Sequence, residues 1–452
     1  MTRDSESTRS PREKVFVCGV ALPGFPDEHE GELSEVRALV TAAEAEVVGE
    51  GIVQRRNRPD PATLMGKGKV EEVEEEVNSL KPDAVVVDND LTPAQVRNLE
   101  KAWGKRVIDR SELILDIFSR RAQTRQARLQ VELAQNEYLL PRLRRMWTHL
   151  ERMEGAIGTR GPGETQLETD RRLLNKRITD LKRELSEIER RRQRQVLARS
   201  EEFKIGLVGY TNAGKSTLLN RLTGSDEFAA DMPFATLDTR TRRWVLPDKR
   251  AVLLSDTVGF LQRLPHHLVA SFHATLEETI HADLLLHVVD ASHPDAIHQM
   301  RAVDEVMGSI TPHLMADVLV FNKVDRVEDP IQVQLLAEGR RESDVVHLSA
   351  HTGEGIDRLI RVVERNLDSR SAEVQLRIPP EQGRLVAHVQ ALGGILEQEF
   401  EEDGTLRVRA RMSPGALGRI EREGGRAVEI RVLEEPRTRR LDGGDEAETA
   451  LI

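Results

Sequence analysis

The chain has 452 residues, a formal charge of −11 at pH 7 and one cysteine, Cys18. This length accommodates roughly three domains, and a lone cysteine excludes a disulfide framework and a cysteine-based zinc site. The negative charge and the 3% aromatic content argue against generic nucleic-acid binding and extensive base stacking. No apolar run is long enough to span a membrane and no apolar signal segment opens the chain, so we expect a cytoplasmic protein without membrane association.

The first domain is predicted over residues 14–110, after a polar start, residues 1–13, that we expect to be disordered. Strand-like and helix-like patterns alternate along it. The expected strands are 15–20, 45–53, 84–87 and 106–108, and the expected helices are 33–43, 70–80 and 92–103. Strands and helices that take turns fold through right-handed crossovers, so this segment predicts a parallel α/β domain.

Residues 111–200 instead predict a long helical hairpin of the coiled-coil type. One segment repeats apolar residues every seven positions, and an earlier segment carries leucines on one helical face. These residues are Leu167, Leu174, Leu181 and Ile188 in the first case, and Leu129, Leu133, Leu140 and Leu143 in the second. A glycine-rich connection, 155–163, joins the two expected helices.

Basic residues gather in this hairpin, because residues 118–200 hold 20 lysines and arginines against 11 acidic residues. Arginine binds phosphate bidentately and stacks on bases, which favours a probe that reaches into RNA. The arginines that support this interpretation are Arg120, Arg121, Arg125, Arg128, Arg142, Arg144, Arg145, Arg152 and Arg160. The alternative is a dimerisation or spacer element with solvated charges, and charge alone does not decide between them.

Residues 201–368 predict a P-loop domain with a doubly wound, mostly parallel sheet. An apolar run ends in Gly209, and Gly214, Lys215 and Ser216 complete the pattern G-x-x-x-x-G-K-S. In this motif the loop amides and a helix N-terminus face a polyphosphate. The lysine reaches the β and γ oxygens, and the serine ligates Mg²⁺.

Three more motifs follow in order, each at the end of an expected strand. Residues 256–259 (Asp-Thr-Val-Gly) offer an acid for the Mg²⁺ shell and a glycine amide for the γ-phosphate. Residues 322–325 (Asn-Lys-Val-Asp) offer a carboxylate for the N1–H and amino groups of guanine, and residues 349–351 (Ser-Ala-His) offer amides for its O6. A nucleotide kinase or an ATPase leaves the last two motifs unexplained, so the set predicts GTP binding.

Hydrolysis is expected to depend on residues 234–238 (Phe-Ala-Thr-Leu-Asp) and on the residue after Gly259. We place Thr236 on Mg²⁺ and the γ-phosphate, with Thr239 and Thr241 as rivals. Phe260 stands where Ras-like enzymes have a glutamine, and a phenyl ring cannot orient water, so we expect slow intrinsic turnover that a partner stimulates. Asn212 either helps to hold K⁺ against the phosphates or only bonds within its loop.

The predicted site therefore combines catalytic, metal-binding and nucleotide-binding residues. The catalytic candidates are Lys215, Thr236, Gly259 and Asn212, and the Mg²⁺ ligands are Ser216 and Thr236. The nucleotide contacts are Gly209, Tyr210, Thr211, Asn212, Ala213, Gly214, Lys215, Ser216, Thr217, Phe234, Ala235, Thr236, Leu237, Asp238, Asp256, Thr257, Val258, Gly259, Asn322, Lys323, Val324, Asp325, Ser349, Ala350 and His351.

Residues 372–435 predict a small C-terminal α+β domain. Its expected order is a strand at 374–378, a helix at 383–392, a strand pair within 396–410, a helix at 414–423 and a strand at 427–433. The acidic, glycine-containing residues 436–452 are expected to be disordered.

Taken together, these motifs resemble the HflX GTPases of the translation-factor-related Obg/HflX group. The stretches that carry the resemblance are 65–72, 128–135, 157–168 and the GTPase motifs with 234–238. The likeness covers roughly residues 15–370, and the glycine-rich stretch 158–168 is its most specific part. The region after residue 372 resembles the family's C-terminal domain only loosely.

The resemblance implies a GTPase that binds the large (50S) ribosomal subunit and its rRNA, and that in some members dissociates idle or stalled 70S ribosomes under stress. It also implies that the N-terminal domain and hairpin reach the peptidyl-transferase region, and that ribosomal subunits stimulate hydrolysis. We expect a monomer. Two alternatives stay open: a ribosome-assembly or RNA-modification GTPase, and a hairpin-mediated dimeric scaffold in which GTP is a structural switch.

Overall fold

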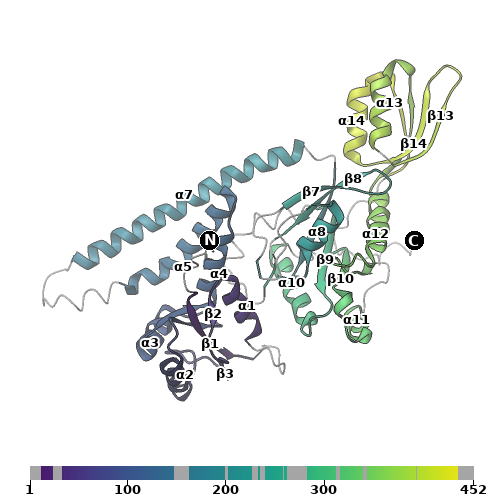
Figure 1. Cartoon of the computed structure of the whole chain (residues 1–452). Coiled ribbons are helices and arrows are strands. Elements are labelled where there is room, and N and C mark those ends of the chain that lie inside the picture. The colour runs from purple at the N-terminus through teal and green to yellow at the C-terminus, as the bar shows by residue number, and fades with distance from the viewer. Residues whose placement is uncertain are drawn as a thin grey trace, which may run out of the picture. The chain divides into compact units, whose positions relative to one another are not determined.

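The computed structural model of the chain, shown in Figure 1, describes most of the sequence. The described residues are 12–23, 33–146, 162–198, 202–225, 233–234, 240–257, 259–261, 282–311, 316–338, 344–392 and 394–435. They fall into two compact units, the first built from the chain up to Ser186 together with Pro233 and Phe234, and the second from the other described residues. Among the described residues, no helix is both long and apolar enough to cross a membrane.

The first unit contains the parallel α/β domain that the sequence predicts. Its strands are β1 (Lys14–Ala21), β2 (Glu46–Val47), β3 (Ile52–Arg55), β4 (Ala84–Val87) and β5 (Arg106–Asp109), and its helices are α1 (Ser34–Ala42), α2 (Lys67–Leu80), α3 (Pro93–Trp103) and α4 (Arg110–Arg121). The strands pair in parallel in the order β2-β1-β4-β5, and β3 also pairs with β1. Local sequence sets the boundaries; for example, Thr92 and Gln95 form a reciprocal capping box at the start of α3, ahead of Pro93.

The single strand expected at 45–53 is wrong, because two short strands take its place. Gly49 and Gly51 lie between them with φ of +74° and +80°. Both angles lie in the left-handed region, which an extended strand does not use. A Cβ at Gly51 would also lie 2.8 Å from the main-chain oxygen of Val17, so the chain approaches β1 closely at this break.

The helical hairpin is present as α5 (Arg125–Met146) and α7 (Pro162–Ala198). Leu129, Leu133 and Leu181 of the expected seam are buried. Arg177 pairs with Glu132 at 2.6 Å and Arg125 with Glu184 at 3.2 Å, so the two helices run antiparallel. The glycines at 155, 158 and 161 of the connection lie outside the described residues.

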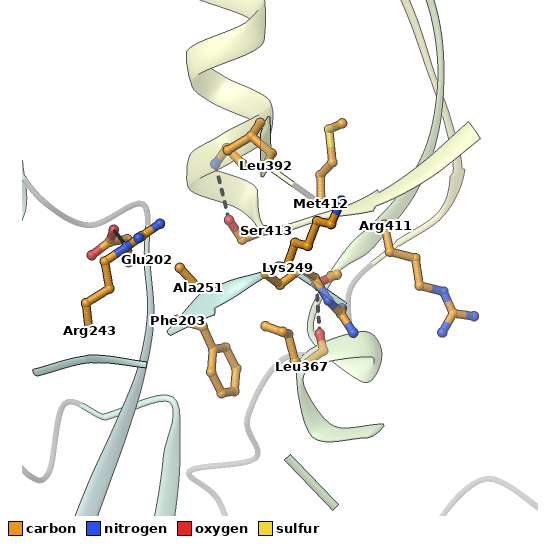
Figure 2. Close-up of a pocket in the computed structure, with 13 residues that line it drawn as sticks. Glu202, Phe203, Arg243, Lys249, Ala251, Leu367, Leu392, Arg411, Met412 and Ser413 are labelled. Carbon is orange, nitrogen blue, oxygen red and sulfur yellow. Dashed lines mark hydrogen bonds and ion pairs between the residues drawn. The ribbon is translucent and has the colours of Figure 1, made fainter. Parts of the chain in front are cut away.

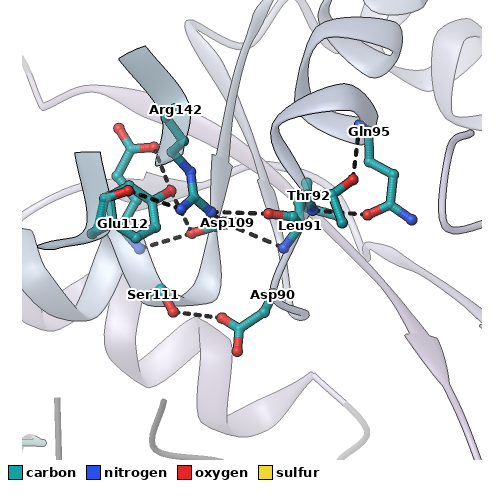
Figure 3. Close-up of polar contacts among 9 residues, drawn as sticks. Asp90, Leu91, Thr92, Gln95, Asp109, Ser111, Glu112 and Arg142 are labelled. Atoms are coloured by element: carbon teal, nitrogen blue, oxygen red, sulfur yellow. Dashed lines mark hydrogen bonds and ion pairs between the residues drawn. The ribbon is translucent and has the colours of Figure 1, made fainter. Parts of the chain in front are cut away.

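One arginine of the hairpin is committed to the α/β domain, which corrects its inclusion among the RNA-facing arginines (Figure 3). Arg142 Nη2 donates to Asp109 Oδ2 at 2.8 Å and to the main-chain oxygen of Leu91 at 2.9 Å. Its guanidinium lies 3.4 Å from the ring centroid of Tyr138, whose hydroxyl donates to Asp109 Oδ1 at 2.9 Å. These contacts tie α5 to the end of β5.

The second unit contains a six-stranded sheet with the order β11-β10-β9-β6-β8-β7, in which only the β7–β8 pair is antiparallel. Its elements are β6 (Phe203–Gly209), α8 (Lys215–Thr223), β7 (Arg240–Val245), β8 (Ala251–Asp256), β9 (Leu284–Asp290), α10 (Ala296–Ile310), β10 (Val318–Asn322), η1 (Val324–Arg326), α11 (Pro330–Leu336), β11 (Val345–His347) and α12 (Ile356–Ser369). All seven residues of β9 are buried. Five of the six residues before Asp290 are apolar, with His287 as the exception, and near-continuous apolar runs of this kind are expected of central parallel strands.

The second unit also contains a four-stranded antiparallel sheet with the order β13-β14-β12-β15. Its elements are β12 (Ala372–Ile378), η3 (Pro380–Gln382), α13 (Gly383–Leu392), β13 (Ile395–Phe400), β14 (Leu406–Met412), α14 (Pro414–Gly424), η4 (Gly425–Ala427) and β15 (Glu429–Glu434). This β-α-β-β-α-β order confirms the α+β class expected for the C-terminal region. The predicted limits between the domains, at 110, 200 and 368, stay predictions.

Candidate nucleotide-binding site

The loop between β6 and α8 is shaped by two glycines that other parts of the sheet approach closely. A Cβ at Gly209 would lie 2.2 Å from the main-chain oxygen of Val288 on β9. Gly214 has a φ of +93°, and a Cβ there would lie 2.2 Å from Asn322 Nδ2. At Gly209 the opposing atom belongs to the main chain, and at Gly214 the left-handed φ adds to the overlap with Asn322, so both positions favour glycine.

Lys215 begins α8 and its ammonium group lies inside the loop. Its Nζ donates to the main-chain oxygens of Gly209 and Tyr210 at 3.0 and 2.8 Å. Burial lowers the pKa of the ammonium group to about 8, although the charge of Asp256 opposes this shift. A polyphosphate in the loop would offer this cation a stronger partner than two carbonyl groups.

Ser216 and Asp256 form the oxygen pair that the sequence predicts beside the phosphates. The Ser216 hydroxyl donates to Asp256 Oδ2 at 2.5 Å, and Asp256, the last residue of β8, is 1% exposed. A hydroxyl and a carboxylate at the phosphate end of the loop are hard oxygen ligands, so this donor set fits Mg²⁺.

The residues after Asp256 are held against the phosphate loop by main-chain hydrogen bonds. Phe260 N donates to Gly209 O at 3.1 Å, and Thr211 N donates to Phe260 O at 2.7 Å. A Cβ at Gly259 would lie 2.8 Å from Thr211 Cα, which again requires glycine. The Phe260 side chain is buried and has no polar atom, so it cannot bond the attacking water in a reaction at this loop.

The expected guanine-reading segment lies at the ends of β10 and β11. Asn322 Nδ2 donates to Ala213 O at 2.8 Å, and Asn322 Oδ1 accepts from Ala350 N at 2.9 Å. A hydrogen bond from the Ser349 hydroxyl is the main reason that the pKa of Asp325 lies below its usual range. Asp325 itself is exposed, so its carboxylate is ionised and accessible to a ligand.

The structure therefore brings the four motifs to one edge of the six-stranded sheet in the second unit. The residues that meet there are Gly209–Gly214, Lys215, Ser216, Thr217, Asp256, Thr257, Gly259, Asn322–Asp325 and Ser349–His351. This is the carboxyl edge of the parallel strands, where open α/β sheets bind ligands. The Thr257 hydroxyl donates to Leu207 O at 2.7 Å, so its side chain fixes the motif to β6.

The segment expected to carry the γ-phosphate threonine is only partly described. Ala235, Thr236, Leu237, Asp238 and Val258 lie outside the described residues, and their nucleotide contacts stay predictions. Phe234 belongs to the first unit, where its ring packs edge-on against that of Phe118 with centroids 4.6 Å apart. Phe234 is only 2% exposed in this packing. Its role as a nucleotide contact also stays a prediction.

Asp290 was not among the predicted site residues, although it ends β9 at the same edge. Like Asp256, it ends a mostly apolar strand, and that placement was the available signal. Its Oδ2 lies 2.7 Å from Lys323 Nζ, inside the guanine-reading motif.

A separate cavity of about 120 Å³ lies elsewhere in the second unit (Figure 2). It is lined by residues of the β7–β8 region, including Lys249 and Arg250, and by Arg411 and Ser413 near the start of α14. Arg250 and Arg411 both pair with Asp368, at 2.6 and 3.1 Å. The cavity contains none of the motif residues, so we assign it no part in nucleotide chemistry.

Comparison with protein-family models divides the chain into four consecutive matches. Residues 30–119 match "GTP-binding GTPase N-terminal", and residues 121–199 match "GTP-binding GTPase Middle Region". Residues 204–323 match "50S ribosome-binding GTPase", and residues 334–432 match "HflX C-terminal domain".

Curated relatives match over most of their own length. The protein called GTPase HflX of Escherichia coli K12 is 45% identical over 388 residues, which is 85% of this chain and 91% of the relative. GTPase HflX of Magnetococcus marinus is 44% identical over 427 residues, which is 93% of this chain and 98% of the relative. GTPase HflX of Caldanaerobacter subterraneus is 41% identical over 395 residues, which is 87% and 90% of the two chains.

Proposed function

The chain belongs to the HflX family of GTPases, and from that premise we propose that it binds the large ribosomal subunit and dissociates idle or stalled 70S ribosomes under stress. The observation that carries the proposal is the match of residues 204–323 to a model described as a 50S ribosome-binding GTPase. A factor with this partner acts in the cytoplasm, and we propose that it does so as a monomer.

We assign the nucleotide to the carboxyl edge described above. Ser216 and Thr236 are the proposed Mg²⁺ ligands, with Asp256 in the outer shell, and the ion would neutralise charge on the β- and γ-phosphate oxygens. The Lys215 ammonium group gives up its hydrogen bonds to the carbonyl groups of Gly209 and Tyr210 and pairs with those phosphate oxygens. The Gly259 amide donates to the γ-phosphate. Asn212, whose φ is +62°, is the candidate for holding K⁺ on the same side.

Slow intrinsic hydrolysis follows from Phe260. Its side chain is 3% exposed and apolar, so the position that orients water in Ras-like enzymes supplies no hydrogen bond. We propose that a ribosomal subunit stimulates the reaction by supplying or arranging the missing group.

The hairpin is the proposed RNA-binding element. Arg171, Arg172 and Lys176 are exposed on α7, and cations on such a surface attract phosphate strongly at low salt. In the proposed cycle, GTP orders the Thr236 segment and the hairpin docks on the large subunit. This docking disfavours the joined 70S ribosome, and hydrolysis then releases the factor.

Co-sedimentation with purified 50S subunits and GTP turnover with and without them test the proposal together. We expect GTP-dependent binding and stimulated turnover, and we expect light scattering to fall when the factor is added to 70S particles. Replacing Arg171, Arg172 and Lys176 by glutamate should weaken 50S binding at least tenfold. Glutamates at Arg301, Arg361 and Arg384, which are also exposed, provide the matched control.

The other candidates give different outcomes. Absence of stimulation and of GTP-dependent co-sedimentation would remove the ribosome proposal while leaving GTP binding intact. An assembly or RNA-modification factor would leave 70S particles whole in these assays and cause subunit precursors to accumulate in cells that lack it. A dimeric scaffold would have the mass of a dimer in solution and a turnover that ribosomes do not change.

A further inference from the structure

Asp290 is joined to the lysine of the guanine-reading motif by a shielded ion pair. The two atoms, Lys323 Nζ and Asp290 Oδ2, are 2.7 Å apart, and the side chains are only 16% and 11% exposed. Strands β9 and β10 place Asp290 directly beside Asn322, one residue before the lysine. The pair is therefore part of the sheet edge and is more protected from water than an ordinary surface ion pair.

The other oxygen of the same carboxylate is also engaged. Asp290 Oδ1 accepts from the main-chain nitrogen of Ser292 at 3.0 Å and from its hydroxyl at 2.6 Å. These two bonds fix the plane of the carboxylate independently of Lys323. Asp290 is thus the fixed partner and the long lysine side chain is the one that gains order.

The backbone of Lys323 supports the same arrangement. Its φ of +61° is uncommon for a residue other than glycine and sets the direction in which the side chain leaves the turn. With both ends constrained, the four-carbon chain of the lysine has few conformations left. A free lysine side chain has among the largest losses of rotamer entropy when it becomes ordered.

We propose that Asp290 is a positioning residue for the guanine base. By holding the Lys323 ammonium group, it sets the aliphatic chain in advance as an apolar surface against which the base lies. The loss of lysine entropy then precedes nucleotide binding and no longer weakens it. This inference rests on the proposed contact of guanine with residues 322–325 and does not depend on the ribosome proposal.

A double-mutant cycle on the full-length, nucleotide-free protein tests the inference, with the Kd for GDP in Mg²⁺ as the readout. Asp290→Asn keeps an acceptor for Ser292 but removes the charge, and Lys323→Met keeps the apolar chain but removes the ammonium group. We expect Asp290→Asn alone to raise the Kd roughly two- to tenfold, which is the range for ordering one long side chain. Combined with Lys323→Met, it should have no further effect.

The control is Asp283→Asn, at the opposite end of β9, where the carboxylate accepts from Lys204 N at 2.8 Å. We expect the control to leave the Kd unchanged even if it lowers the Tm. The inference is overturned if Asp290→Asn leaves the Kd for GDP unchanged, or raises it equally with and without Lys323→Met. The second result would mean that Asp290 acts only through its turn with Ser292.

Asp325→Asn separates this inference from the placement of guanine beneath it. A variant that keeps the original preference for guanine would overturn that placement, whatever Asp290 does. A variant that changes the preference, together with no coupling between Asp290 and Lys323, would overturn the Asp290 inference alone.

Discussion

The side-chain nitrogen of Asn322 bonds to the main-chain oxygen of Ala213 at 2.8 Å, which joins the guanine-reading strand to the phosphate loop. The oxygen of the same amide accepts from Ala350 N at 2.9 Å. One buried side chain, 2% exposed, therefore connects three of the four nucleotide motifs. The phosphate and base ends of the site are mechanically coupled even though more than a hundred residues separate them in sequence.

Asn322→Ala should damage stability and nucleotide binding together. It leaves a buried amide and a buried carbonyl without their partner, which costs about 2–4 kcal/mol in the free energy of unfolding. It also frees the two loops from each other, so we expect the Kd for GDP to rise at least tenfold, as measured by fluorescence titration. Asn366→Ala is the control, because Asn366 bonds to Val362 within its own helix at 2.9 Å. Similar losses in both variants would contradict the connecting role.

The glycines that flank α8 offer a second comparison. Gly214 and Gly224 both have positive φ, +93° and +66°, but a Cβ meets Asn322 in the first case and nothing within 4 Å in the second. We expect Gly224→Ala to cost about 1–2 kcal/mol from backbone strain alone. Gly214→Ala should cost about 1–3 kcal/mol more, because the Asn322 bond must also break, and should abolish tight GDP binding. Urea unfolding measures both costs. Equal values would contradict the prediction, because they would show that the Asn322 side chain moves aside without lowering the free energy of unfolding.

Much of the phosphate site could be predicted because its signals are local. An apolar strand, a glycine at each end of a short loop and a lysine at the first position of a helix occur within thirteen residues. The spacing of these residues indicates where the phosphates would bind. Asn322 and Asp325 were found in the same way, since Asn322 ends a buried strand and Asp325 follows three residues later.

The pairing of Asp290 with Lys323 could not be predicted, because it depends on which strands are neighbours. An aspartate at a strand end is compatible with a turn, a cap or a ligand, and only the β9–β10 register decides. The contact of Phe234 with Phe118 joins residues far apart in sequence and likewise leaves no local pattern. Arg142 appeared to be one more basic residue of the hairpin until the fold placed Asp109 beside it.

The reading of guanine by Asp325 has a direct test. The Ser349 hydroxyl keeps the pKa of this carboxyl group below its usual range, so the group is an ionised acceptor throughout the neutral pH range. Asp325→Asn replaces one acceptor by an amide donor. This donor repels the amino group of guanine but can hydrogen-bond to the carbonyl group that xanthine has in place of that amino group. We expect the ratio of Kd values for GDP and XDP to change by roughly a hundredfold or more. Asp329→Asn, which affects the cap of α11, should leave that ratio as it is.

The cluster in Figure 3 predicts how stability depends on pH. Asp109 is fully buried, and burial raises the pKa of its carboxyl group above the ordinary value of 3.8 although Arg142 and Tyr138 oppose the shift. An acid whose pKa is higher in the folded chain contributes stability that is complete below the unfolded pKa and lost as pH rises through the folded pKa. Asp109→Asn cannot titrate and does not share that loss. The free energy of unfolding of the original protein minus that of the variant should therefore fall as pH is raised from about 4 towards 7.

Tyr138→Phe is the matched control for this prediction. It removes the hydroxyl that donates to Asp109 at 2.9 Å but leaves the carboxyl group free to titrate. We expect it to lower the free energy of unfolding by about 1–2 kcal/mol and to keep the loss of stability with rising pH. Urea titrations at several pH values, followed by circular dichroism, provide the data for all three proteins. A difference between the original protein and Asp109→Asn that stays constant with pH would mean that the contacts to the carboxylate balance the effect of burial, and one that grows with pH would mean that they exceed it; either result would contradict the prediction.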